Sequence, residues 1–194
     1  MITGDPDATN RRQFFKQFLK KTVLPVADFV EDRLEVLAPQ SKPLLRPPGA
    51  IPELSFLETC QRCGHCAAAC PADAIRPIRG GDESLRGTPW IDPDRQPCVV
   101  CDGLECMQVC PSGALQRLML DDIKIGLAVV DEETCVRTEG EDCRLCVTSC
   151  PLGERAIRLD GDGAVFVIAS GCIGCGVCQH ACPTQPRAIR VMLE

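Results

Sequence analysis

The residues of this 194-residue chain that could do chemistry are its 16 cysteines, because their spacing is regular. They fall into four groups of four, and each group ends in a Cys-Pro pair. In chain order, the groups are Cys60, Cys63, Cys66 and Cys70; Cys98, Cys101, Cys106 and Cys110; Cys135, Cys143, Cys146 and Cys150; and Cys172, Cys175, Cys178 and Cys182. Thiolates at this density are typical metal ligands.

Groups one and four have the spacing C-x2-C-x2-C-x3-C-P, with which bacterial ferredoxins hold [4Fe–4S] clusters. Three thiolates on a tight loop bind one cluster, and the cysteine before proline ligates a different cluster. Zinc sites instead pair two C-x-x-C units across a longer loop, and cysteines this close in sequence are poor disulfide partners. The C-x-x-C-H motif of haem attachment is missing from the sequence. We therefore predict iron–sulfur clusters.

Sixteen cysteines supply four thiolates to each of four [4Fe–4S] clusters, with none left over. Such a cluster has no open iron for a substrate, whereas catalytic metal sites keep a position open. The sequence also has no phosphate-binding loop and no dinucleotide fingerprint. We therefore predict an electron carrier, or a subunit of a larger oxidoreductase system, rather than an enzyme. The alternative function is a maturation factor or redox sensor for a partner metalloenzyme.

The charge of the chain bears on its partners. Residues 1–46 carry eight basic and six acidic residues, and residues 47–194 carry 13 basic and 21 acidic residues. An acidic body argues against nucleic-acid binding, and it favours a redox partner protein with a basic docking surface. No apolar stretch approaches the length of a transmembrane helix, so we expect no such helix.

Short structural units repeat between the cysteine groups. A β-rich run precedes groups two to four, and a segment such as AIR follows each Cys-Pro pair. Residues 75–92 and 157–168 have the pattern of hairpins with polar, glycine-containing turns. We predict an α+β fold of tandem bacterial-ferredoxin-like modules, each with short strands and helices around two clusters. This four-cluster domain is expected over residues 47–194, after an N-terminal segment at 1–46.

The N-terminal segment contains NRRQFFKQFLKK at residues 10–21, which resembles the start of a twin-arginine export signal. Such a signal needs an uncharged apolar region next, but charged residues follow here. Apolar residues recur instead at intervals of three and four, which predicts an amphipathic helix at 9–37. Its basic start could contact a membrane surface, or the helix could pack on the domain. We predict a cytoplasmic location, peripheral at the inner membrane if the helix binds lipid. The alternative is the periplasm, reached through a twin-arginine signal.

The fourth cysteine of each group, here called the crossing cysteine, is expected to ligate the cluster of another group. The groups must therefore work in pairs, and the spacing leaves two pairings open. Because the outer groups are regular and the inner groups are widened, the symmetry favours nested pairing, one with four and two with three. The nested ligand sets are Cys60, Cys63, Cys66 and Cys182; Cys172, Cys175, Cys178 and Cys70; Cys98, Cys101, Cys106 and Cys150; and Cys135, Cys143, Cys146 and Cys110. The alternative is sequential pairing, one with two and three with four.

Three stretches resemble a known family of iron–sulfur proteins. Residues 44–71, 87–115 and 171–191 are similar to ferredoxin-type proteins of the NapG/MauM group, and the Pro-Pro-Gly-Ala approach at 47–50 is the most specific part. The group is similar to the four-cluster electron-transfer subunits of molybdopterin oxidoreductases, so the resemblance implies nested pairing. It also implies an electron relay between a membrane quinol system and a partner oxidoreductase.

Overall fold

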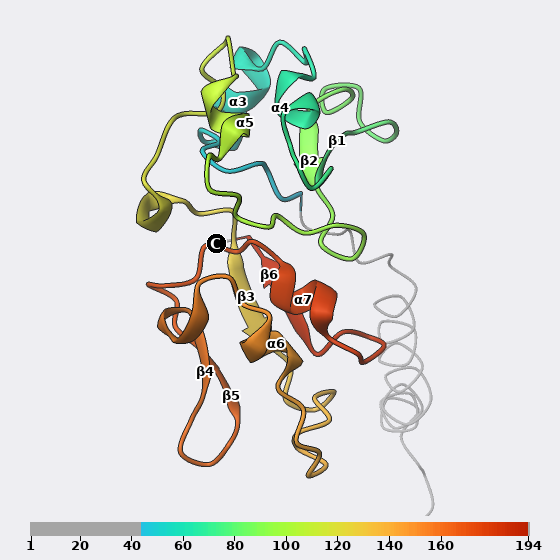
Figure 1. The fold of residues 1–194 in the computed structure, drawn as a ribbon. Helices are drawn as coiled ribbons and strands as arrows, with labels where there is room; N and C mark the ends of the chain where they lie inside the picture. The colour runs from blue at the N-terminus through green and yellow to red at the C-terminus, as the bar shows by residue number, and fades with distance from the viewer. Residues whose placement is uncertain (1–43, 194) are drawn as a thin grey trace, which may run out of the picture. The chain divides into compact units, whose positions relative to one another are not determined.

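The computed structural model describes residues 44–193, which belong to one compact unit (Figure 1). Leu45 and Arg46, which the sequence analysis assigns to the N-terminal segment, are buried in this unit. The expected helix at 9–37 and the arginine pair lie outside the described residues, so they stay predictions. Within residues 44–193, no helix is long and apolar enough to cross a membrane.

Two successive lobes make up this unit: lobe 1 is residues 44–122 and lobe 2 is residues 123–193. Lobe 1 contains α3 (Glu53–Thr59), α4 (His65–Ala68), β1 (Ile75–Pro77), β2 (Pro89–Ile91), α5 (Glu105–Gln108) and the 3-10 helix η2 (Leu120–Asp122). Lobe 2 contains β3 (Leu127–Val130), α6 (Leu145–Thr148), the 3-10 helix η3 (Gly153–Arg155), β4 (Ile157–Leu159), β5 (Val165–Val167), α7 (Val177–Ala181) and β6 (Ile189–Met192). Within the described residues, the α-helices other than α3 are single turns, each beside a cysteine group.

The two predicted hairpins are confirmed. β1 pairs antiparallel with β2, with Ile75 opposite Ile91. β4 pairs antiparallel with β5, with Ile157 opposite Val167. Each hairpin connects the two cysteine groups of its own lobe, so it returns the chain to the place where the first group lies (Figure 1).

A second pairing closes each lobe at its two ends. In lobe 2, β3 precedes the third cysteine group and pairs with β6, which follows the fourth group, so that Leu127 lies opposite Met192. In lobe 1 the same role falls to one bridge between Ala50 and Leu115. The described residues therefore contain one α+β plan twice, although the closure is shorter in lobe 1.

Candidate iron–sulfur centres

The structure brings the cysteines together in four sets of four, and each set lines one cavity. Site A is lined by Cys60, Cys63, Cys66 and Cys110. Site B is lined by Cys70, Cys98, Cys101 and Cys106. Site C is lined by Cys150, Cys172, Cys175 and Cys178. Site D is lined by Cys135, Cys143, Cys146 and Cys182. Sites A and B lie in lobe 1, and sites C and D in lobe 2.

The predicted nested pairing is therefore wrong, and the sequential alternative describes the structure. Cys182 lies with Cys135, Cys143 and Cys146 at site D, not with the first group. Cys70 lies with the second group, Cys110 with the first and Cys150 with the fourth. Each crossing cysteine thus joins the other group of its own lobe.

The hairpins explain this pairing. Cys66 lies in the one-turn helix α4 and Cys70 lies two residues after its end, and the two cysteines line different cavities. The β1–β2 hairpin then folds the second group back beside the first, because elements joined by a short hairpin lie next to each other. The widened gaps of groups two and three are accommodated inside their own loops. Their symmetry along the chain therefore places no constraint on which groups meet.

The loops of groups one and two turn through residues with strained backbones. Arg62, Val100 and Leu104 have positive φ angles of 54°, 53° and 43°. For a β-branched residue such as Val100, this left-handed conformation is an outlier. Glycines take the equivalent positions in the fourth loop. Strain of this kind persists where surrounding structure enforces it, and it concentrates at functional sites.

Burial makes the thiols inside the loops poor acids. It raises the pKa of Cys66 and Cys98 to about 11, and that of Cys106 and Cys175 to about 12. Neighbouring thiols of the same site add to the effect. A metal binds the thiolate, so iron must replace the proton that burial otherwise retains. These thiols gain most from a positive ion in the cavity.

Two crossing cysteines behave differently. Burial raises the pKa of Cys182, but hydrogen bonds from Thr184 and backbone N–H groups outweigh it, and the net pKa is lowered. The same balance lowers the pKa of Cys110, where Leu115 N–H and Ser112 are the donors. These donors stabilise negative charge on the sulfur.

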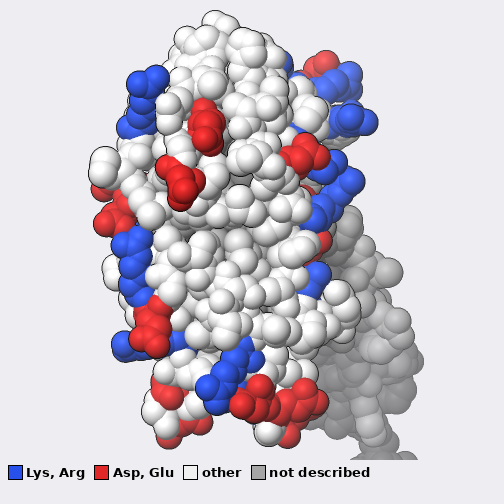
Figure 2. Space-filling view, viewed as in Figure 1, with Lys and Arg blue, Asp and Glu red and all other residues white. Residues whose placement is uncertain are grey.

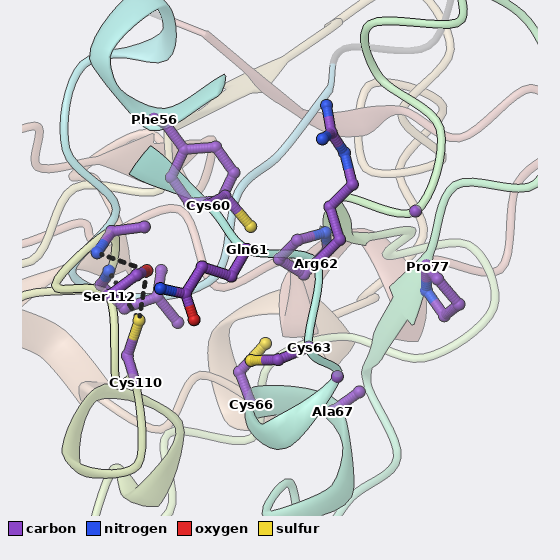
Figure 3. A pocket seen from close by; sticks show the side chains of 15 residues that line it. Phe56, Cys60, Gln61, Arg62, Cys63, Cys66, Ala67, Pro77, Cys110 and Ser112 are labelled. Atoms are coloured by element: carbon purple, nitrogen blue, oxygen red, sulfur yellow. Dashed lines mark hydrogen bonds between the residues drawn. The ribbon is translucent and has the colours of Figure 1, made fainter. Parts of the chain in front are cut away.

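Site A is the widest of the four. Its cavity of about 260 Å³ lies between the first cysteine loop and the side chains of Phe56 and Leu115. Figure 3 shows Cys110 and Ser112 entering from one side and Cys63 and Cys66 from another. Cys63 is the most exposed of the 16 cysteines. Site A is thus the site that is most open to solvent.

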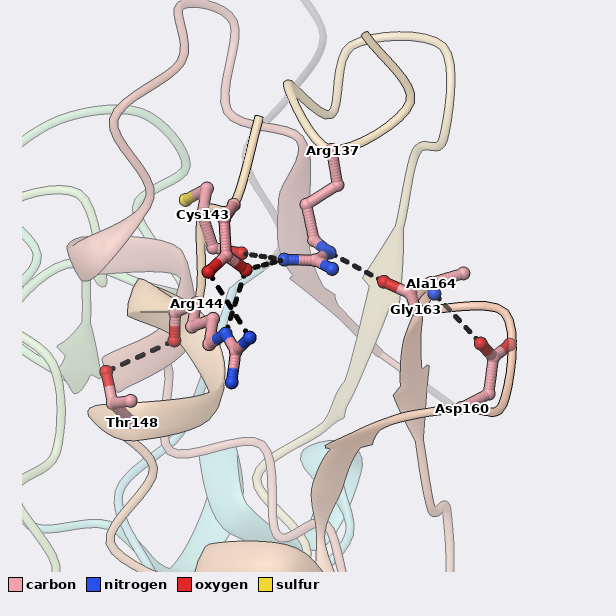
Figure 4. A network of polar contacts seen from close by, with 8 residues as sticks. Arg137, Cys143, Arg144, Thr148, Asp160, Gly163 and Ala164 are labelled. Atoms are coloured by element: carbon pink, nitrogen blue, oxygen red, sulfur yellow. Dashed lines mark hydrogen bonds and ion pairs between the residues drawn. The ribbon is translucent and has the colours of Figure 1, made fainter. Parts of the chain in front are cut away.

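Site D has the longest cysteine loop, and the side chain of Arg137 holds this loop in place (Figure 4). Arg137 donates from Nε to the Gly163 carbonyl at 2.6 Å and from Nη1 to the Cys143 carbonyl at 2.9 Å. The Nη1 atom also lies 3.1 Å from a carboxylate oxygen of Asp142. The arginine therefore fastens the inserted residues between Cys135 and Cys143 to the turn of the β4–β5 hairpin.

Comparisons with known proteins agree with this geometry. Residues 59–114 and 128–191 each match a family model described as a 4Fe-4S dicluster domain. The chain is 40% identical to the ferredoxin-type protein NapG of Escherichia coli, over 76% of this chain and 70% of the relative. It is 39% identical to the methylamine utilization ferredoxin-type protein MauM of Paracoccus denitrificans, with the same coverage. A second MauM, from Methylobacillus flagellatus, is 34% identical over 98% of this chain and 86% of the relative.

The chain belongs to the NapG/MauM family of ferredoxin-type proteins. The two dicluster matches coincide with the two lobes, each with its own pair of cysteine groups. The predicted resemblance to the NapG/MauM family is thus confirmed, although the nested pairing that it implied is not.

The residues of this NapG/MauM-family chain fit [4Fe–4S] clusters in their donor chemistry. Each cavity has four thiols on tight loops and is otherwise lined mainly by apolar groups. In residues 44–193, no three histidine, cysteine or acidic side chains converge on a position for a single metal ion. The thiols of each site surround a space instead. His65 and His180 are exposed and are not among the residues that line the four cavities.

Sequence reasoning missed several residues around the sites. Ser112 and Thr184 follow their crossing cysteines at the same offset, so the pattern Cys-Pro-Ser/Thr would have been a usable signal. Glu105 lies with its carboxylate 3.2 Å from the Cys101 sulfur. The extra residues of the second group signalled a longer loop, but not that contact.

Proposed function

We propose that this chain is an electron-transfer subunit that holds four [4Fe–4S] clusters and relays electrons to a partner oxidoreductase. The observation that carries the proposal is the division of all 16 cysteines into four complete sets. When bound, such a cluster accepts and releases single electrons. The cysteine thiolates hold it at every corner, so the protein supplies position and environment and leaves no corner for a substrate.

The order of the sites along the fold supports an electron relay rather than four independent redox centres. Cys66 of site A and Cys70 of site B are linked by one turn of helix, and the same applies to Cys146 of site D and Cys150 of site C. Each lobe therefore holds two neighbouring sites. A chain of such sites carries electrons from one end of the molecule to the other.

The partners that we propose follow from charge and from the family. The MauM relatives are named for methylamine utilization. For this chain we propose a quinol system or ferredoxin-like donor and a larger oxidoreductase as acceptor. Figure 2 shows acidic side chains at the lower end of the molecule in that view. The segment around the third cysteine group carries four exposed glutamates, Glu132, Glu133, Glu139 and Glu141. A basic partner surface would complement them.

The proposed location is the cytoplasm, at the membrane surface if residues 9–37 bind lipid. The test is a fusion of residues 1–40 to a reporter that is active only outside the cytoplasm. A silent reporter is expected, and an active reporter would instead support twin-arginine export.

The function itself is tested by reconstitution under anaerobic conditions. Iron and sulfide are measured per chain, and the reduced protein is examined by electron paramagnetic resonance (EPR). We expect iron and sulfide for four clusters, reversible reduction by a low-potential donor and re-oxidation by a partner that co-purifies. As a matched pair, Cys66→Ala should lose one cluster and Ser149→Ala none. Clusters that cannot be reduced reversibly would contradict the relay.

A further inference from the structure

The two lobes meet where residues 93–98 of lobe 1 run along the fourth cysteine loop and α7 of lobe 2. The backbone N–H of Cys98 donates to the carbonyl of Cys175 at 3.0 Å. Nδ1 of His180 lies 3.0 Å from the carbonyl oxygen of Pro93. A Cβ atom added at Gly176 would lie 2.7 Å from the Pro93 side chain. The two segments are thus in direct backbone contact.

The Gln179 side chain also contributes to this junction, next to an apolar core in which Ile173 and Val191 of lobe 2 pack with residues of lobe 1. Gln179 is buried, with 8% of its surface exposed, and both ends of its amide are used. Nε2 donates to Oδ1 of Asp94 in lobe 1 at 2.8 Å, and Oε1 accepts from the N–H of Val191 in β6 at 2.8 Å. The Nε atom of Arg187 lies 3.6 Å from the same Asp94 oxygen. Gln179 therefore ties α7 and β6 to the 93–98 segment.

This junction joins ligands of two different sites. Cys98 belongs to site B and Cys175 to site C, and one hydrogen bond connects their backbones. Cys110 of site A and Cys182 of site D are instead bonded to groups within their own lobes. The sites are thus ordered A, B, C, D.

We propose that electrons pass between the lobes from site B to site C, or the reverse, and that Gln179 is the positioning residue for this crossing. The inference rests on the proposed relay function. In each event one electron leaves a reduced site in one lobe and reduces an oxidised site in the other. No bond is made or broken and no proton moves. Electron transfer falls steeply with distance, so a residue that positions the two lobes affects the rate at which electrons pass between them.

The test exchanges the hydrogen-bond donor and acceptor at positions 179 and 94. It uses the reconstituted full chain at mildly alkaline pH. In Gln179→Glu, the new carboxylate still accepts from Val191 N–H but faces the Asp94 carboxylate, and the junction should open. In Asp94→Asn, the new amide can still accept from Gln179. In the double variant, the amide introduced at position 94 can donate to the carboxylate introduced at position 179, so the contact is restored with its roles reversed. Coupled neighbours of this kind are not additive.

Three quantities are measured: iron per chain, the magnetic interaction between reduced clusters by EPR, and the rate of electron equilibration after a light-driven reduction. Gln179→Glu should keep its iron, lose the interaction between lobes and slow the equilibration. The interactions within each lobe should remain. Asp94→Asn and the double variant should behave like the wild type, as should the exposed control Gln116→Glu.

Two results would overturn the inference. One is an unchanged interaction between lobes in Gln179→Glu with all its iron, and the other is a double variant that does not recover. If Gln179→Glu loses iron, the interaction between the lobes is measured in His180→Phe instead, because this variant removes only the contact with Pro93. That variant should then weaken the interaction, and no change would count against the crossing. A wild type that takes up no electrons reversibly would overturn the relay itself, together with this step.

Discussion

The two lobes share one plan but differ in what fills their interiors. The buried core that centres on lobe 1 includes large side chains, among them Phe56, Leu45, Ile91 and Leu115. The core of lobe 2 consists of three alanines, two isoleucines and three cysteines, and its members are Ala128, Ala156, Ala188, Ile157, Ile189, Cys172, Cys178 and Cys182. The larger apolar core thus centres on lobe 1 and continues into lobe 2 through Ile123, Ile125, Ile173 and Val191, whereas the separate core of lobe 2 contains few large apolar side chains.

The difference shows where the folding free energy of each lobe originates. Burying a large apolar side chain contributes about 1.5–3 kcal/mol, and an alanine contributes far less. Where the apolar core is this small, metal binding is itself the folding free energy. We therefore expect packing to stabilise lobe 1 in addition to cluster binding, and we expect the part of lobe 2 around its separate small core to depend more on cluster binding.

Removing iron should have the largest effect, and it should reveal a difference in stability between the two lobes. With rising chelator, we expect lobe 2 to lose protection from hydrogen exchange before lobe 1. Peptides that contain Ile157 and Ile189 should exchange first, and peptides around Phe56 and Leu115 later. Hydrogen exchange with mass spectrometry measures the order, with the untreated protein as control. Loss of both lobes at one chelator concentration would show that the larger core does not stabilise lobe 1.

Removing one crossing cysteine should damage one lobe only. Cys110→Ala should lose the cluster of site A and leave the EPR signals of lobe 2 unchanged. Cys182→Ala should lose the cluster of site D and leave lobe 1 unchanged. Nested pairing makes the opposite prediction, because Cys182 would then complete the set of Cys60, Cys63 and Cys66. Iron content and EPR spectra of the two variants distinguish the pairings.

Each lobe has an arginine over a phenylalanine, one buried and one exposed. The Arg46 guanidinium carbon lies 4.7 Å from the ring centre of Phe56, which is fully buried. The Arg158 carbon lies 5.8 Å from the ring centre of Phe166, which is 48% exposed. Phe56→Ala should destabilise the protein by about 3–5 kcal/mol because it leaves a cavity. Phe166→Ala should cost about 0.5 kcal/mol.

Denaturant unfolding followed by circular dichroism measures this pair of variants, with iron content checked in both. Arg46 also donates to both carboxylate oxygens of Glu53 and to the Pro89 carbonyl. The ring of Phe56 therefore supports a polar anchor as well as a core. Equal losses in the two variants would refute the difference between the lobes.

A carboxylate beside one ligand should separate the reduction potentials of the sites. Glu105 precedes the third cysteine of its group, and the equivalent residues in lobe 2 are Leu145 and Val177. An iron-bound thiolate has no proton to donate, so the Glu105 carboxylate opposes added negative charge. Glu105→Gln should raise the potential of site B by on the order of tens of millivolts. An EPR-monitored redox titration measures it, with Glu83→Gln as the surface control. A shift in all four sites would rule out a local effect.

The parts that the sequence predicted are those with local causes. The cysteine spacing indicated which thiols would lie together, and three cysteines of each group do line one cavity, because a short loop keeps them close. The hairpins at 75–92 and 157–168 followed from short apolar runs around a polar turn. In each case the residues that determine the structure are close together in the chain.

The parts that the sequence did not predict depend on contacts between distant residues. Nothing near Cys110 indicates that its sulfur faces Cys60 and Cys63, because the β1–β2 hairpin makes that contact. Gln179 and Asp94 lie 85 positions apart, so their hydrogen bond has no sequence signal. The symmetry of loop lengths was misleading because loop length acts inside a loop and does not select its neighbour.

A small effect on both lobes is expected from a turn that recurs after the crossing cysteines. The third residue after Cys70 and Cys150 has a positive φ angle in both lobes: Asp73 at 53° and Gly153 at 60°. A Cβ added at Gly153 would meet nothing within 4 Å, so Gly153→Ala tests backbone strain alone. It should destabilise lobe 2 by about 1 kcal/mol. Asp73→Gly should stabilise lobe 1 by less than about 1 kcal/mol, because aspartate tolerates this conformation and also contacts Arg76 at 3.2 Å. Thermal unfolding of both variants measures the difference, and a stabilised Gly153→Ala would contradict the shared turn.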